Sequence, residues 1–195
     1  MAKILGNLGV TVLLGALLML VVLYGFHGSQ IGEGAQFLNG FLRFLHVLCG
    51  IMWIGLLYYF NFVQIPTMPK VPADLKPGVS KYIAPEALFW FRWAALATVV
   101  TGLIVAMLSG YVHQALMLKS PYRVIGFGMW LALIMAFNVW FLIWPNQKKA
   151  LGIVEASPEA KAKAATTAMI FSRTNTMLSI PMLYCMVTQG FLGGA

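Results

Sequence analysis

Five long apolar runs occupy most of this chain, and they constrain its fold more than any other feature. Each run has close to the ~20 residues that an α-helix needs to cross the hydrocarbon core of a bilayer. Of the 195 residues, 61% are hydrophobic and 9% are charged, whereas a soluble domain is typically about 45–50% apolar. The sequence therefore predicts an all-α integral membrane bundle with five transmembrane helices, forming a single membrane domain over 1–195. The expected spans lie near 7–26, 41–63, 90–112, 124–144 and 170–192.

The cations in the predicted loops indicate an orientation. Three fall on one side of the bundle, namely Arg43, Lys119 and Arg123, and the larger group on the other side comprises Lys3, Lys70, Lys76, Lys81, Lys148, Lys149, Lys161 and Lys163. By the positive-inside rule the N-terminus is cytoplasmic, and five crossings place the C-terminus in the periplasm. We therefore expect a multi-pass protein of the bacterial inner membrane. Because the cations lie between apolar runs and not along one face, the net charge of +8 does not indicate nucleic-acid binding.

Prolines and caps predict how two of the connections behave. Five prolines between residues 64 and 87 favour an ordered or extended connector without a long helix. Ser157 followed by Pro158 is typical of an N-cap with proline at the first helical position, so a helix is expected to start there and run into the last span. Within that span Pro181 removes the hydrogen bond to the Met177 carbonyl and is expected to bend the helix.

All three histidines fall at the predicted outer face, and one of them belongs to a helical stripe. Arg43, His46, Gly50, Trp53 and Leu57 share a face at helical spacing. This face suits a porphyrin, with imidazole as axial ligand, glycine leaving room for the flat ring, and arginine pairing with propionates. We take His46 as the first candidate ligand and His113 as the second, with haem b as the cofactor. The alternative is that His46 packs between helices, bonded to a neighbouring carbonyl.

Polar and aromatic side chains gather at the predicted inner ends of the later spans. Two arginines stand about one turn inside a helix end, where a guanidinium needs an anionic partner or must extend to the membrane surface. The candidate binding residues for an anionic small molecule are Tyr59, Arg92, Asn138, Arg173 and Asn175. In the alternative interpretation, these amides and rings tie helices together and anchor them to head groups.

Four stretches in the same order carry a family resemblance: LHVLCGIMWIGLLYYFNFVQIP around His46, EALFWFRWAA around Arg92, FNVWFLIWPNQKK around Asn138 and SRTNTMLSIPML around Arg173. Together they resemble the membrane domain of the bacterial cytochrome-linked urate oxidase (urate hydroxylase) family over residues 38–190. The resemblance implies oxidation of urate to 5-hydroxyisourate, with electrons passed to a C-terminal cytochrome c domain. The sequence contains no Cys-x-x-Cys-His, so we expect a separate cytochrome c as partner.

The span with His46 and Trp53 also resembles copper-resistance permeases and the membrane-bound protoporphyrinogen oxidase, in which a histidine at that position is linked with haem. Two functions stay open at this point. One is a redox enzyme or redox subunit that passes electrons to a cytochrome. The other is a non-catalytic accessory subunit of a larger respiratory or oxygenase complex, in a homo- or hetero-oligomer. Transport ranks last because the sequence has no internal repeat.

Overall fold

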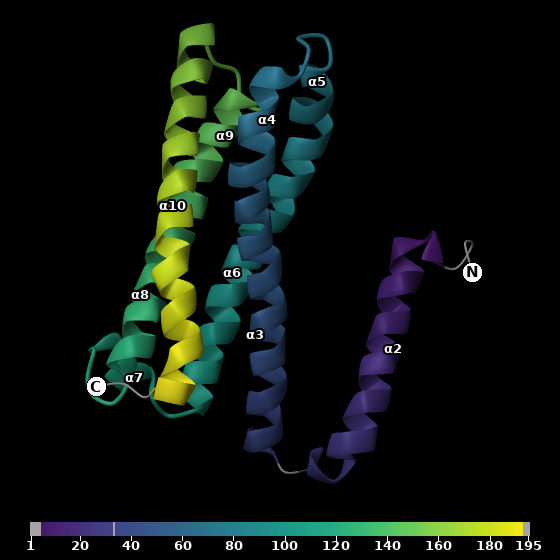
Figure 1. Cartoon of the computed structure of the whole chain (residues 1–195), viewed down its shortest axis with the longest axis vertical. Helices are drawn as coiled ribbons and strands as arrows, with labels where there is room; N and C mark the ends of the chain where they lie inside the picture. Colours follow the sequence, from purple (N-terminus) through teal and green to yellow (C-terminus); the bar gives the residue numbers. More distant parts are fainter. Residues whose placement is uncertain (1–4, 33, 193–195) are drawn as a thin grey trace. The chain divides into compact units, whose positions relative to one another are not determined.

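The computed structural model describes residues 5–32 and 34–192, and within these ranges the chain forms helices and connecting turns without a strand (Figure 1). The all-α prediction is confirmed. The chain divides into two compact units, residues 1–41 and 42–195. In the described ranges four helical stretches are long and apolar enough to cross a membrane. They are Leu8–Gln30, Ala35–Lys70, Lys76–Leu108 and Arg123–Ala150.

The first unit contains helix α2 (Leu8–His27), the short 3-10 helix η1 (Gly28–Gln30) and the beginning of α3 (Ala35–Tyr58). Asn7 caps α2, because its side-chain oxygen accepts a hydrogen bond from the backbone N–H of Val10 at 3.2 Å. All faces of α2 are apolar, which is typical of a membrane span. The expected span near 7–26 therefore coincides with α2.

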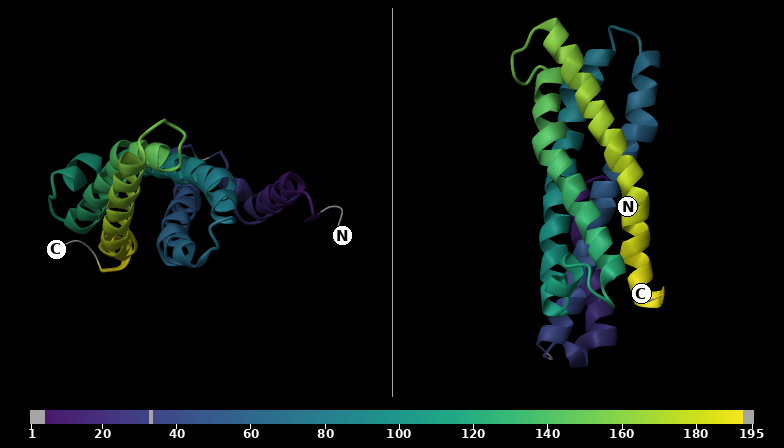
Figure 2. Two further views of the ribbon diagram at one scale, coloured as in Figure 1. Left: turned by 90° about the horizontal axis from the view of Figure 1, so that it is seen from above. Right: turned by 90° about the vertical axis from the view of Figure 1, so that its left-hand side faces the viewer.

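The second unit consists of long helices that lie alongside one another (Figures 1 and 2). Three of them change helical geometry along their length, whereas the last is uninterrupted. In chain order, the elements of the second unit after α3 are η2 (Tyr59–Gln64), α4 (Ile65–Thr67), η3 (Met68–Lys70), α5 (Lys76–Gly78), η4 (Val79–Ile83), α6 (Ala84–Leu108), α7 (Val112–Leu116), α8 (Arg123–Phe137), η5 (Asn138–Ile143), α9 (Trp144–Ala150) and α10 (Pro158–Leu192).

Three prolines explain the π-helical segments η2, η4 and η5. Pro66, Pro85 and Pro145 each stand two residues after one of these segments. A proline lacks the N–H that bonds the carbonyl four residues earlier, and its ring collides with that carbonyl in an α-helix. In all three cases that carbonyl lies inside the π-helical segment, where a wider turn accommodates the ring.

The expectation of a connector without long helix between residues 64 and 87 is therefore wrong for most of its length. Only residues 71–75 interrupt the helical structure, and a continuous helix already begins at Lys76. The prolines are compatible with this helix because Pro77 stands in its first turn, where the N–H would have no partner anyway, and the π-helical segment η4 accommodates Pro85.

Helix α10 begins as the sequence predicts. The backbone N–H of Ala160 donates to the Ser157 hydroxyl oxygen at 3.3 Å, and Pro158 is the first helical residue. The backbone N–H of Glu159 and the Ser157 hydroxyl also lower the pKa of the Glu159 carboxyl. The helix continues through Pro181 to Leu192. It is not among the four most apolar stretches, so five crossings and the orientation of the termini stay predictions.

The contact of α8 with α10 and α7 requires glycine. A Cβ atom at position 128 would lie 2.8 Å from Cys185 Cβ of α10, and one at position 126 would collide with the backbone carbonyl of Ala115 in α7. Small residues at such positions let helix backbones approach closely in membranes. The core beside this contact is formed by fully buried side chains, the largest of which are Trp53, Leu57, Phe91, Met135 and Val139.

We expect Gly128→Ala to lower the free energy of unfolding in detergent by about 1–3 kcal/mol, because the added methyl group must displace α10. Gly190→Ala on α10 is the matched control, since a Cβ there meets nothing within 4 Å. Thermal unfolding followed by circular dichroism measures both. Equal stability of the two variants would contradict the close α8–α10 contact.

Candidate functional site

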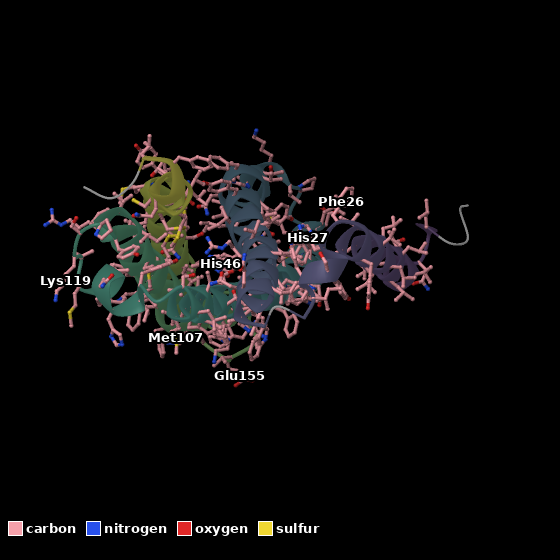
Figure 3. All side chains as sticks on the ribbon, turned by 90° about the horizontal axis from the view of Figure 1, so that it is seen from below. Phe26, His27, His46, Met107, Lys119 and Glu155 are labelled. Atoms are coloured by element: carbon pink, nitrogen blue, oxygen red, sulfur yellow. The ribbon has the colours of Figure 1, made fainter. Side chains whose placement is uncertain are left out.

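A cavity of about 580 Å³ lies between α3, α6, α8 and α10 of the second unit. Its walls are mainly aliphatic side chains and methionines, and its polar lining comes from Arg43, His46, Thr98 and Tyr111. This volume falls in the range of about 300–1,000 Å³ that is usual for small-molecule sites, which combine apolar walls with few polar groups. Figure 3 shows His46 between the helices of this unit.

The His46 ring is held by α6. Its Nδ1 atom lies 2.9 Å from the Thr98 carbonyl oxygen and 3.2 Å from the Thr101 hydroxyl oxygen. Because a carbonyl can only accept, Nδ1 carries the hydrogen and donates it, and Nε2 keeps its lone pair. A packing histidine makes such a contact, and so does a metal-bound histidine, which typically donates its second ring nitrogen to a carbonyl. Both interpretations of His46 therefore include this hydrogen bond.

Gly102 provides the surface on which the His46 ring rests. A Cβ atom at position 102 would lie 2.7 Å from Cε1 and 3.1 Å from Nδ1 of that ring. Sequence reasoning missed Thr98, Thr101 and Gly102 as parts of this site. The available signal was the Thr-Val-Val-Thr-Gly run, which places the two threonines and the glycine near one face of a predicted span.

At the end of the cavity the Arg43 guanidinium donates from Nη2 to the Ser109 hydroxyl at 3.4 Å. Tyr111 lies beside it and stacks on Tyr122, with ring centroids 5.1 Å apart. Farther in, Trp53 is fully buried, and its Nε1 has no hydrogen-bond partner among the described residues. Of the five residues predicted to share a helix face, Arg43, His46, Gly50 and Trp53 line this one cavity, whereas Leu57 is fully buried in the core.

His113 is exposed on α7 and is not among the residues that line the cavity. Within the described ranges no group of three or more His, Cys, Asp or Glu side chains is placed to hold a metal ion.

The predicted inner polar layer links helices to each other. Asn138 Nδ2 of η5 donates to Asn175 Oδ1 of α10 at 2.8 Å, and Asn175 Nδ2 donates to the Met135 carbonyl at 2.9 Å. Both asparagines are buried. Nearby, Asn61 Nδ2 donates to the Ser172 hydroxyl at 2.8 Å. These amides make the helix-joining contacts of the alternative interpretation.

The other predicted members of this layer make no hydrogen bond to the two asparagines among the described residues. Tyr59 is half-buried beside Phe60, and Arg173 is exposed. The Arg92 guanidinium stacks over the Trp144 ring, with Cζ 4.0 Å from the centroid, and Nη1 donates to the Leu88 carbonyl at 3.4 Å. Arg92 thus contacts Leu88 and Trp144 rather than the buried amide pair.

We expect Asn175→Ala to lower the free energy of unfolding by about 0.6–2 kcal/mol, because Asn138 and the Met135 carbonyl lose their partner inside the bundle. Thr174→Ala is the matched control, since the Thr174 hydroxyl bonds only the Ile170 carbonyl of its own helix. Denaturation in mixed detergent micelles compares the two variants. A loss for Thr174→Ala as large as that for Asn175→Ala would contradict a special role for the asparagine pair.

A comparison with protein families matches residues 122–192 to the family described as urate oxidase N-terminal. The predicted resemblance is confirmed over this segment, which comprises α8, η5, α9 and α10 and contains two of the four resembling stretches. No curated protein and no solved structure matches the chain. His46, Arg43 and Gly102 stand on α3 and α6, outside the matched residues.

Proposed function

We propose that this chain is a membrane-embedded redox protein of the urate-oxidase type, with haem b held in the cavity by His46. One observation supports the proposal most: the Thr98 carbonyl fixes the ring so that Nε2, the nitrogen with the lone pair, is left for a ligand in the cavity. Ligating histidines in proteins are oriented by this kind of contact, in which a second group sets the tautomer.

The remaining residues of the cavity fit a porphyrin. Arg43 at the end of the cavity provides a cation for propionate carboxylates, and a guanidinium binds carboxylates in two parallel hydrogen bonds. Gly50 and Gly102 have no side chains, so the cavity wall near His46 leaves room for a flat ring. The apolar side chains exclude water. When bound, the haem would supply one-electron chemistry.

The partner and the substrate belong to the same proposal. In this proposal a separate cytochrome c accepts electrons at the Arg43 end of the bundle, which is the predicted periplasmic face, and the substrate resembles urate in being a planar anion. Of the inner-layer residues, Arg173 keeps this proposed role best, because the amides of Asn138 and Asn175 already bond each other and the Arg92 guanidinium already contacts Trp144.

The second candidate is an accessory subunit of a respiratory or oxygenase complex. This candidate is favoured by the same asparagine pair. The amides of Asn138 and Asn175 form hydrogen bonds within the bundle, which stabilises a scaffold and leaves fewer hydrogen-bonding groups to bind a substrate. In that case the urate-oxidase-like fold is kept for assembly with partner subunits.

The absorption spectrum of the purified protein tests the haem proposal. We expect a Soret band that shifts on reduction with dithionite and is lost in His46→Ala. His27→Ala is the matched control, because this exposed histidine of the first unit has no role in the cavity. His113→Ala reports whether a second histidine contributes. A colourless wild-type protein with intact helical content, purified from haem-supplemented cells, would refute haem binding and favour the accessory subunit.

We expect Gly102→Ala to shift the Soret maximum and to weaken haem retention by about tenfold or more, because the new methyl group must move the His46 ring. The overlap would be severe, since the Cβ atom would lie 2.7 Å from Cε1. Haem transfer to apomyoglobin measures retention. Gly190→Ala, where a Cβ meets nothing within 4 Å and which does not line the cavity, serves as control. An unchanged rate in Gly102→Ala would argue against His46 as the ligand.

A further inference from the structure

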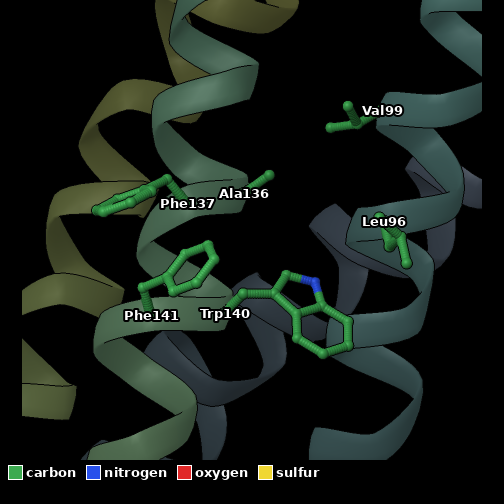
Figure 4. Close-up of a pocket in the computed structure, with 6 residues that line it drawn as sticks. All are labelled: Leu96, Val99, Ala136, Phe137, Trp140 and Phe141. Atoms are coloured by element: carbon green, nitrogen blue, oxygen red, sulfur yellow. The ribbon is translucent and has the colours of Figure 1, made fainter.

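An apolar groove of about 400 Å³ runs along the seam between α6 and the helix formed by α8 and η5 (Figure 4). Its lining is almost entirely carbon. The lining residues are Leu96 and Val99 of α6, Ala136 and Phe137 of α8, and Trp140 and Phe141 of η5. Such a groove at membrane depth can accept an acyl chain.

The same seam ends in two cations. Trp93 of α6 contacts Trp140 edge-on, with ring centroids 5.3 Å apart, at the groove itself. About one helical turn farther along, the Arg92 guanidinium of α6 lies over Trp144 of α9, with Cζ 4.0 Å from the ring centroid. Lys148 of α9 approaches the same indole, with Nζ 5.7 Å from the centroid. The groove and the cations thus form one continuous surface.

Neither cation has a carboxylate partner among the described residues. Glu86, in the first turn of α6, instead accepts a hydrogen bond from Trp90 Nε1 at 3.0 Å. Two like charges that lie beside one ring repel each other, and no carboxylate of the described residues offsets this repulsion. An anion beside Trp144 would relieve it.

We infer that this seam binds an anionic phospholipid. We call it the α6–α9 seam, and it consists of the six groove residues together with Arg92, Trp144 and Lys148. The phosphate lies at Arg92 and Lys148, and an acyl chain lies in the groove. A free anion would not use the groove. A zwitterionic lipid brings its own cation, which the two side chains repel. Basic sites between membrane helices on the cytoplasmic side are suited to anionic head groups, and the lysine-rich end of this chain is the predicted cytoplasmic end.

Native mass spectrometry of the full chain tests this inference, with phosphatidylglycerol and phosphatidylcholine titrated in equal amounts. The wild-type protein should retain phosphatidylglycerol preferentially. Each cation near the membrane surface contributes about a fivefold gain in affinity, so Arg92→Gln and Lys148→Gln should each weaken phosphatidylglycerol binding by about fivefold. Arg92→Lys, which keeps the charge, should lose less than Arg92→Gln.

Lys149→Gln is the matched control for Lys148→Gln. Lys149 is the next residue of the same helix and has the same charge, but it is exposed and makes no contact with Trp144. It should bind phosphatidylglycerol like the wild type. Ala136→Phe, which fills the groove, should weaken binding without changing any charge. Water-soluble glycerol phosphate should not displace the lipid.

Equal retention of the two lipids by the wild type, or equal losses in Lys148→Gln and Lys149→Gln, would overturn the inference. Displacement by glycerol phosphate would show a plain anion site. Displacement by urate, with binding of urate lost in Arg92→Gln, would assign the cations to a substrate. The inference does not depend on haem, because Arg92→Gln and Lys148→Gln leave His46 untouched and should leave the Soret band unchanged.

Discussion

In hydrocarbon, every hydrogen-bonding group must find its partner inside the protein, and this constraint determines where the polar side chains of this bundle lie. His46 bonds the Thr98 carbonyl of α6, Asn138 bonds Asn175 of α10, and Asn61 bonds Ser172 of α10. Each bond joins two different helices. Since a one-turn shift of any of these helices would leave a buried polar group unpaired, these contacts fix the relative depth of the helices and hence the place of the cavity.

In the part of the chain that the structure describes, the two ends of the second unit differ in whether hydrogen bonds join α3 to α10. Toward the lysine-rich end, Tyr58 and Ser179 link α3 to α10 at 3.0 Å, and the amides close the interior. Toward Arg43 the same two helices line opposite parts of the cavity, which therefore lies beyond the last link between them. The π-helical segments η2 and η5 carry Asn61 and Asn138, so the prolines that follow them also influence which side chains turn inward.

Helix α6 belongs to both proposed sites. Thr98 and Gly102 serve the cavity, Arg92 and Leu96 serve the α6–α9 seam, and Val99 lines both. The family match covers α8 to α10, which contribute walls to each site, whereas the histidine that defines the cavity comes from α3. The redox proposal therefore depends on residues outside the matched segment. The lipid proposal depends on α9, which is inside it, and on α6, which is outside.

The sequence by itself determined the all-α class, the first span near residues 7–26, the start of α10 at Ser157–Pro158, and the shared face of Arg43, His46, Gly50 and Trp53. These features follow from spacing within one helix, where residues three and four apart are always neighbours. Only the tertiary structure decided that the His46 ring meets the Thr98 carbonyl, 52 residues away, and that Asn138 and Asn175 bond each other. It also decided that three prolines are accommodated by π-helical turns. Such contacts depend on which helix faces meet, and packing of the whole chain sets that choice.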